Sequence, residues 1–308
     1  MDRNVRTDLA QEAFACLPDT PGVRAREEQP MEGITVTHVE ILTPEGEAAL
    51  GKPVGTYVTI DAPNLQGQDG MLEERVAQVL SKELEKMLGP LGDRDTVLVA
   101  GLGNDAITPD ALGPRVVAKT AVSRHVTEYL KDQVDERVRP VCAISPGVLG
   151  VTGIETGEIL RGVVERVRPR AVIAIDALAS RSTERISTTI QLADTGIRPG
   201  SGLGNRRMEI SRESLGVKVI AIGVPTVVHA STISQDAVTL LLEEMGAASE
   251  GHDLVELVGK VVNEKIGPLV VTPKEIDRII EDSARVVSTG INMALHGVTM
   301  EEVRRFLS

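Results

Sequence analysis

Two aspartates follow apolar segments that are typical of buried strands. Asp110 comes after the segment TVLVAGL (96–102), and Asp176 ends the apolar run AVIAID (171–176). In open α/β sheets, ligands bind outside the carboxyl ends of the strands. Brought together there, two carboxylates would resemble the proton-sharing pair that activates a water molecule in acid proteases. These residues therefore favour hydrolysis of a peptide bond, provided that the two strands are neighbours in the sheet.

The turn after the first of these strands is rich in glycine. Gly101 and Gly103 permit a sharp backbone turn directly off the strand. With Asn104 they form a GLGN turn that we expect to support the site.

A helix is predicted over residues 109–126, with Thr108 as its cap and Pro109 at the first helical position. Asp110 then lies in the first turn, where the helix N-terminus favours an ionised carboxylate. Asp176 ends a run that should be buried, which favours its protonated form. Each aspartate could also have a purely structural role. Asp110 is a common kind of helix-start acid, and Asp176 could cap the turn that follows it.

Other reactive groups lack the sequence context that catalysis needs. Ser145, Ser180 and Ser201 have no G-x-S-x-G elbow, and Cys142 lies within an apolar segment as a small buried side chain would. The histidines show no H-E-x-x-H spacing, so neither a metal nor a cofactor is expected. The segment GSGLGNRR (200–207) opens no evident helix after a strand, which favours a surface loop over a dinucleotide site.

Composition argues against several classes of partner. The formal net charge is −12, and the chain has two Phe, two Tyr and no Trp, so nucleic-acid binding is not expected. No apolar run reaches the length of a membrane span, and no signal peptide is evident. Cys16 and Cys142 are the only cysteines, which is typical of a reducing cytoplasm rather than of a disulfide scaffold.

Aliphatic strands alternate with amphipathic helices along most of the chain, which predicts one α/β domain whose sheet is covered on both faces. Strands are expected at 34–42, 54–60, 96–102, 140–144, 171–176, 187–192 and 217–224. Helices are expected at 71–88, 109–126, 155–167, 232–245 and 272–295, with a shorter one from Thr299. The first two strands form a β-rich N-terminal elaboration. Residues 1–32 lack periodicity and contain three prolines, so a tail or arm is expected there.

Several long segments together resemble the germination proteases of spore-forming bacteria. They include GLGNDAITPDALGPRVV, AVIAIDALASRS and DTGIRPGSGLGNRRMEIS, and the likeness runs from VRTDLA to INMALH, so it covers nearly the whole chain. The resemblance implies an atypical aspartic endopeptidase whose two functional aspartates are Asp110 and Asp176. It also implies a three-layer α/β/α fold with a mostly parallel central sheet, similar to that of hydrogenase maturation proteases.

The resemblance further implies a biological setting. Members degrade small acid-soluble spore proteins in the cytoplasm of the spore core, are made as zymogens and form homotetramers. The segment TDLAQE (7–12) is similar to the site that the family cuts in its substrates, so the tail is expected to be a built-in substrate. Self-cleavage between Asp8 and Leu9 would remove residues 1–8 as a propeptide and leave residues 9–308 as a single peptidase domain.

Two departures from the family pattern and two alternatives accompany this hypothesis. From the resemblance, an acid is expected where this chain has His229, and a longer segment is expected where it has residues 245–269. A maturation-type protease acting on a metalloenzyme precursor is the second enzyme hypothesis. A nucleotide-binding regulator that uses its GLGN turns is the alternative from a different class.

Overall fold

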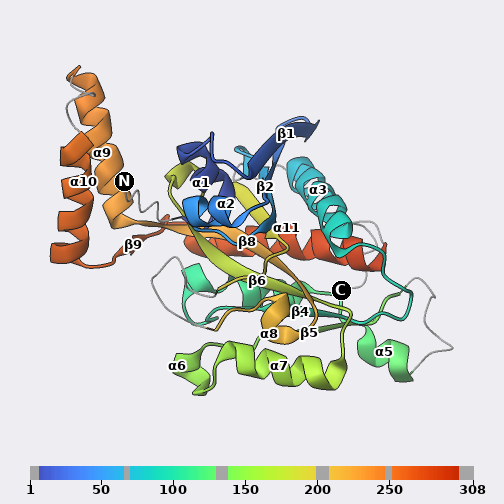
Figure 1. The fold of residues 1–308 in the computed structure, drawn as a ribbon. Helices are drawn as coiled ribbons and strands as arrows, with labels where there is room; N and C mark the ends of the chain where they lie inside the picture. Colours follow the sequence, from blue (N-terminus) through green and yellow to red (C-terminus); the bar gives the residue numbers. More distant parts are fainter. Residues whose placement is uncertain (1–6, 66–69, 130–137, 199–207, 247–251, 298–308) are drawn as a thin grey trace.

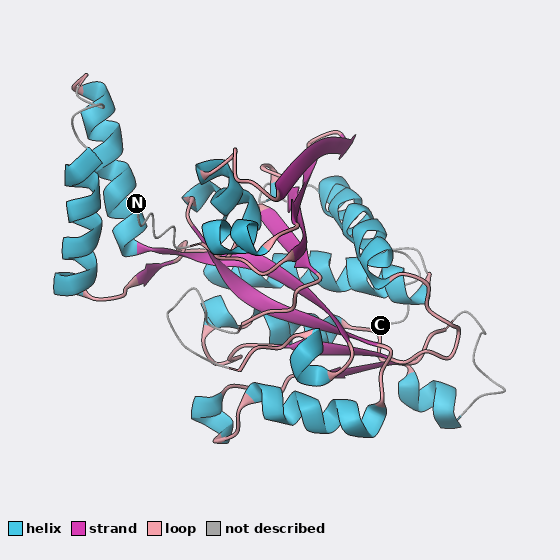
Figure 2. Ribbon diagram, viewed as in Figure 1, coloured by secondary structure: helices cyan, strands magenta, loops and turns pink. Residues whose placement is uncertain are grey.

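The chain folds around one large mixed β-sheet (Figures 1 and 2). The computed structural model describes residues 7–65, 70–129, 138–198, 208–246 and 252–297. Within these residues the strands are β1 (Val23–Met31), β2 (Ile34–Ile41), β3 (Gly55–Asp61), β4 (Val97–Gly101), β5 (Val141–Ile144), β6 (Ala171–Ser180), β7 (Thr189–Ala193), β8 (Lys218–His229) and β9 (Val270–Val271). Their order is β1-β2-β3-β7-β8-β6-β4-β5, and β9 pairs with the end of β8.

The sheet has a parallel half and an antiparallel half. β5, β4, β6 and β8 run parallel to one another, and β4, β6 and β8 are almost entirely buried, as expected for strands covered on both faces. β7, β3, β2 and β1 continue the sheet with antiparallel pairing. The predicted α/β fold with a β-rich N-terminal elaboration is confirmed, and its parallel strands form one half of a mixed sheet.

Helices complete the layers on both faces. The helices of the described residues are α1 (Ala10–Cys16), α2 (Pro44–Leu50), α3 (Gly70–Leu88), α4 (Leu112–Lys119), α5 (Arg124–Tyr129), α6 (Leu149–Thr152), α7 (Thr156–Val167), α8 (Arg212–Leu215), α9 (Ala230–Glu244), α10 (His252–Val261) and α11 (Ile276–His296). Of these, α9 and α10 project from the sheet instead of covering a face (Figure 1). Single turns are the 3-10 segments η2 (Thr108–Asp110) and η3 (Thr183–Arg185) and the π-helical segment η5 (Val262–Ile266).

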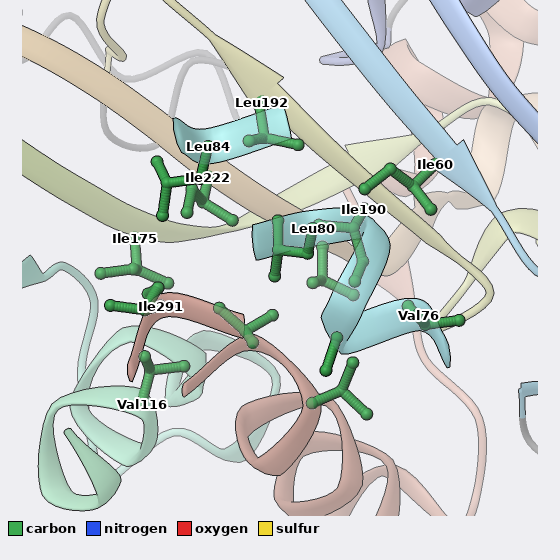
Figure 3. Packing of buried hydrophobic residues seen from close by; sticks show 14 of the residues in the cluster. Ile60, Val76, Leu80, Leu84, Val116, Ile175, Ile190, Leu192, Ile222 and Ile291 are labelled. Carbon is green, nitrogen blue, oxygen red and sulfur yellow. The ribbon is translucent and has the colours of Figure 1, made fainter. Parts of the chain in front are cut away.

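The two faces have separate hydrophobic cores. α3, α4 and α11 bury the larger core against the sheet, in a cluster that includes Leu84 of α3, Ile291 of α11 and Ile222 of β8 (Figure 3). On the opposite face, α7 and α8 cover the parallel strands, and α1 and α2 cover the antiparallel ones. The helices hold the parallel strands from both sides, so their carboxyl ends are fixed relative to one another.

The described N-terminal residues are part of this fold, so the tail predicted for residues 1–32 is wrong over residues 7–31. Leu9 and Ala10 have no exposed surface. β1 pairs with β2 along most of its length. As an edge strand β1 leaves most of its side chains exposed, so it lacks the alternation from which a strand is predicted. Residues 1–6 lie outside the described part of the chain.

The helix predicted over residues 109–126 is replaced by three short elements, η2, α4 and α5. The side chain of Asn292 on α11 accepts from the backbone N–H of Ala121 and donates to the carbonyl oxygen of Lys119. These two bonds satisfy backbone groups at the end of α4 and just beyond it, so the helix ends there at little cost. A contact with a residue far along the chain therefore decides where α4 stops.

The last predicted helix begins later than expected, at Ile276 rather than at Thr272. The hydroxyl of Thr272 donates to the carbonyl oxygen of Thr226 on β8 at 2.9 Å, so it is engaged in joining the chain to the sheet instead of capping a helix. The short helix predicted from Thr299 lies outside the described residues.

Candidate active site

β4 and β6 are neighbouring parallel strands, as the two-aspartate hypothesis requires. Gly101, the last residue of β4, pairs with Ile175 of β6. One residue later, the backbone N–H of Leu102 donates to the carbonyl oxygen of Ile175 at 2.8 Å. The chain that leaves β4 therefore starts beside Asp176.

Asp110 is held by the turn that leaves β4. The backbone N–H of Asn104 donates to Oδ2 of Asp110 at 2.8 Å and to its carbonyl oxygen at 3.1 Å. The segment η2, which ends at Asp110, contacts β6, β8 and α11. Asp110 is partly exposed, whereas Asp176 is only 4% exposed. The two aspartates thus lie at the same end of the parallel strands, one on β6 and one on the loop after its neighbour β4.

Asp176 lies inside β6 rather than at its end, because the strand continues to Ser180. The alternative in which Asp176 caps a following turn is therefore wrong. Its Oδ1 accepts from the backbone N–H of Ala177 at 3.0 Å. β4 stops beside Ile175, so Asp176 stands at the position where this edge of β6 ceases to pair with β4.

Glycine at two of the predicted supporting positions lets the following chain lie directly on β4. A Cβ atom at Gly103, where φ is +104°, would lie 2.0 Å from the carbonyl oxygen of Asp110. A Cβ atom at Gly101 would lie 2.2 Å from the carbonyl oxygen of Gly113 at the start of α4. Any larger residue at either position must displace the segment that carries Asp110.

Thr226 also holds this segment, and the sequence reasoning missed it. Its hydroxyl donates to the carbonyl oxygen of Pro109, the residue before Asp110, at 2.8 Å. The register between β6 and β8 shifts at this point, because Pro225 pairs with Leu178 and the next pair skips Thr226. Bulges of this kind redirect side chains. Pro225 directly follows the strand predicted at 217–224 and was the available sequence signal, because a proline within a central strand marks a bulge.

The N-terminal segment lies along the edge of β6 that β4 leaves. The backbone N–H of Asp8 donates to the carbonyl oxygen of Ala179 at 2.9 Å, and Oδ2 of Asp8 accepts from the N–H of Ala179 at 2.8 Å. Ile175 and Ala179 are four residues apart on a strand of period two, so their backbone groups point to the same edge. Asp8 therefore occupies the continuation of β4, three residues along β6 from Asp176.

Gln191 of β7 fixes the bond at which cleavage is predicted. Its Nε2 donates to the carbonyl oxygen of Asp8 at 3.1 Å, and its Oε1 accepts from the N–H of Ala10 at 2.7 Å. Between them, Leu9 is fully buried and its N–H donates to the hydroxyl of Thr7 at 3.0 Å. The predicted cleavage bond is enclosed by the fold.

Charged groups anchor the same segment on both sides. The buried carboxylate of Glu12 accepts from the backbone N–H groups of Arg181 and Ser182, just beyond β6, at 2.8 and 3.0 Å. The ammonium group of Lys52 donates to the carbonyl oxygen of Thr7 at 3.0 Å. Burial lowers the pKa of Lys52, and the carboxylates of the N-terminal segment partly offset that effect. The segment is thus bound by charge-assisted bonds as well as by apolar contact.

The alternative nucleophiles lie in unfavourable surroundings. Burial raises the pKa of the Cys142 thiol, which disfavours the reactive thiolate. Ser180 is fully buried, and its hydroxyl donates to the carbonyl oxygen of Ser182 at 2.8 Å. Ser145, directly after β5, is exposed. Ser201, with the rest of the segment 200–207, lies outside the described residues.

The amino-acid sequence matches a known protein family over nearly its whole length. The family model described as germination protease matches residues 6–257 and 250–307. The chain belongs to the germination protease family. A germination protease of Caldanaerobacter subterraneus subsp. tengcongensis is 51% identical over 319 residues, which are 98% of each chain. One from Clostridium perfringens (strain ATCC 13124) is 47% identical over 324 residues, 99% of each chain. One from Halalkalibacterium halodurans is 39% identical over 358 residues, 97% of this chain and 96% of the relative.

Membership of this family makes the chain a peptidase of germination. Among solved structures, a [NiFe] hydrogenase maturation protease HycI from Thermococcus kodakarensis KOD1 is 19% identical and covers 59% of this chain and 99% of its own, with a TM-score of 0.31. A likeness of that size identifies neither a shared site nor a shared mechanism. None of the described helices combines the length and the apolar character that a membrane-spanning helix needs.

Proposed function

We propose that the chain is an aspartic-type endopeptidase that begins the degradation of small acid-soluble spore proteins in the core of the germinating spore. Asp110 and Asp176 are the catalytic pair. The observation that carries this proposal is the placement of Asp176 on β6 beside the end of β4, and of Asp110 on η2, which itself contacts β6. No cofactor is invoked for the reaction.

In the proposed reaction a water molecule lies between the two carboxyl groups. The ionised carboxylate removes a proton from the water as its oxygen attacks the scissile carbonyl carbon, and the protonated carboxyl donates a hydrogen bond to the developing oxyanion. When the tetrahedral intermediate collapses, the C–N bond breaks. The leaving amine takes the proton that the carboxylate had removed from the water. The backbone N–H of Asn104 favours the ionised form of Asp110, and the burial of Asp176 favours its neutral form.

The edge of β6 beyond Ile175 is the proposed binding site for the substrate. An extended peptide can add to a sheet edge through its backbone, which gives affinity without demanding a particular sequence. Asp8 already makes one such backbone bond with Ala179. A substrate that continued β4 toward Ile175 would pass directly beside Asp176.

The N-terminal segment is the proposed built-in substrate and inhibitor, with cleavage between Asp8 and Leu9 producing the mature chain from residue 9. In the described arrangement Asp8 lies opposite Ala179, about 10 Å along β6 from Asp176 at roughly 3.3 Å per residue. The segment therefore has to slide along this edge, or leave and return in another register, before its bond reaches the pair. We infer that the zymogen is inactive because the segment occupies the substrate edge in a non-productive register.

The proposed homotetramer has a candidate interface in the helical arm, formed by α9, α10, η5 and β9, which projects from the sheet beyond His229 (Figure 1). The apolar side chains of the arm that are at least 39% exposed are Leu240, Leu241, Met245, Leu254, Leu257, Val261, Ile266, Leu269, Val270 and Val271. Exposed apolar surface of this extent is typical of an interaction surface.

Cleavage of a defined peptide tests the proposed function. The mature chain from residue 9 should cut a peptide containing Thr-Glu-Phe-Ala-Ser-Glu once, after the first Glu, and should leave a scrambled peptide of the same composition intact. Mass spectrometry of the products reads the position of the cut. An intact substrate, or cuts spread over both peptides, would refute the assignment. Light scattering on a Leu240→Ser, Leu257→Ser double variant tests the arm, since a tetramer built through it should dissociate.

A further inference from the structure

Three metal-binding side chains converge far from the two aspartates, between the β1–β2 hairpin and α3. They are Glu28 on β1, His38 on β2 and Glu83 on α3, whose side chains are of types that can bind a metal, and one donor atom from each lies within 4.8 Å of the others. The Nε2 atom of His38 is 3.5 Å from Oε1 of Glu28 and 3.9 Å from Oε2 of Glu83. Glu28 pairs with Val36 across the hairpin, and His38 is two residues after Val36 on the same strand. Glu28 and His38 therefore lie on the face of the hairpin where Val36 packs against α3.

The Nε2 atom of His38 is buried and makes no hydrogen bond within the described residues. Its separations from the two carboxylates are longer than a hydrogen bond, and buried polar atoms seldom lack one. Glu83 is also buried, with 4% of its surface exposed. An imidazole nitrogen and a carboxylate are thus held close together out of solvent without bonding to each other.

The spacing of these atoms fits a shared ion. In a tetrahedral zinc site with bonds of about 2.0–2.1 Å, neighbouring ligand atoms are roughly 3.3 Å apart. The two separations from His38 exceed that value by only about 0.2 and 0.6 Å. Glu28 is partly exposed on the edge strand, so a small change in its side-chain torsions closes its own gap to His38. The larger gap lies between His38 and the buried Glu83, and a small shift of that carboxylate would close it.

The charged groups around the cluster also favour a bound cation. Lys86 donates to Oε1 of Glu83 at 2.5 Å and leaves Oε2 turned toward His38. Lys86 balances one of the two carboxylates, and its side chain is 63% exposed. Arg26 lies 3.9 Å from Oε2 of Glu28, so each carboxylate turns one oxygen toward an exposed cation and the other toward His38, whose nitrogen can offer a lone pair. One imidazole with two carboxylates suits a divalent transition ion such as Zn²⁺, whereas Ca²⁺ and Mg²⁺ require more oxygen ligands.

We propose that Glu28, His38 and Glu83 bind a divalent transition ion of the zinc class, with solvent as the fourth ligand. The ion clamps the edge hairpin of β1 and β2 to α3. It stabilises the antiparallel half of the sheet and takes no part in peptide hydrolysis. Sequence spacing does not reveal such a site, because its ligands come from two strands and a helix that meet only in the folded chain.

Zinc titration of the full-length, untagged chain tests the proposal after treatment with a chelator and removal of that chelator. Isothermal titration should show one equivalent of Zn²⁺ bound, with a rise in melting temperature, and neither Mg²⁺ nor Ca²⁺ at the same concentration should produce that rise. Glu28→Gln and His38→Gln should each weaken zinc binding at least roughly tenfold and remove most of the thermal shift, as expected for the loss of a ligand.

The matched control is His125→Gln, which removes an exposed histidine on α5 and should bind zinc as the wild type does. Glu28→Gln changes a partly exposed side chain on an edge strand, so it should fold even if His38→Gln does not. The proposal is overturned if the wild type binds no stoichiometric zinc. It is equally overturned if Glu28→Gln, folded by circular dichroism, binds zinc with wild-type affinity, since the ion would then lie elsewhere.

Discussion

The backbone N–H of Leu102 donates to the carbonyl oxygen of Ile175 at 2.8 Å, just beyond the last residue pair of β4 and β6. This bond places the start of the GLGN turn beside Asp176. The GLGN turn holds Asp110 through the backbone N–H of Asn104. Beyond the bond β6 no longer pairs with β4, and the N-terminal segment lies on that edge. One strand ending therefore positions the proposed catalytic pair, the substrate edge and the segment that covers it.

Replacing either proposed catalytic aspartate should remove activity without unfolding the chain. Asp110→Asn and Asp176→Asn should each lower the rate of peptide cleavage by about 10²- to 10⁴-fold, because an amide can act neither as the base nor as the acid. Asp105→Asn is the matched control, since Asp105 is an exposed acid of the same loop that pairs with Arg115. Near-wild-type rates in either test variant, with an unchanged circular dichroism spectrum, would contradict the mechanism.

Gly103→Ala should displace the loop that carries Asp110. The alanine Cβ would lie 2.0 Å from the carbonyl oxygen of Asp110 at a backbone φ of +104°. We expect a loss of stability of about 1–3 kcal/mol together with a lower kcat. Gly150→Ala on α6 is the control, because a Cβ there meets nothing within 4 Å. Denaturant unfolding and peptide kinetics measure the two effects, and an unaltered kcat in Gly103→Ala would argue against the supporting role of this turn.

Gln191→Ala should release the N-terminal segment. The substitution removes the bonds to the carbonyl oxygen of Asp8 and to the N–H of Ala10, at a cost of about 1–3 kcal/mol to the docked segment. Conversion to the chain that begins at Leu9 should then be faster, as followed by intact mass. The same cut should be absent when Asp176→Asn is combined with Gln191→Ala.

Slower conversion in Gln191→Ala would mean that Gln191 assists cleavage instead of restraining the segment. Ragged N-termini, or the same cut in the doubly substituted chain, would mean that the segment is trimmed by another protease. Gln78→Ala on α3 serves as the control, since that residue lies on a different element and should convert at the wild-type rate.

Stability should fall on acidification through His296. This residue is buried at the end of α11, its Nε2 lies 2.9 Å from the carbonyl oxygen of Ala121, and burial is the main cause that lowers its pKa below 6.5. The unfolded chain therefore binds a proton at a higher pH than the folded chain does. The contribution of His296 is full above about pH 6.5 and is lost as the pH falls through the lower folded pKa, with a slope of at most about 1.4 kcal/mol per pH unit.

Urea unfolding between pH 7.5 and 5 measures this dependence. His296→Gln should flatten it, whereas His125→Gln, which changes an exposed histidine, should not. Equal slopes in wild type and His296→Gln would show that other groups cause the acid sensitivity.

Elements whose signal is local could be predicted from the amino-acid sequence. The aliphatic runs of β4, β6 and β8 predicted buried strands, and the amphipathic period of residues 71–88 predicted α3, because burial on both faces or on one face leaves its pattern within a single segment. The same runs pointed to Asp110 and Asp176, since an acid that follows or ends a buried strand is conspicuous. The family could be inferred from the long sequence segments that resemble germination proteases.

Features that depend on contacts between distant residues could not be predicted before the fold was known. Asp8 is fixed by Ala179 and Gln191, so the N-terminal segment is folded although its own sequence resembles a tail. α4 stops where Asn292 reaches it, and the Glu28, His38 and Glu83 cluster exists only once a hairpin meets a helix. A local pattern records whether a residue is buried but not which residue buries it. Whether two strand ends are neighbours, and what lies across them, is settled only when the sheet forms.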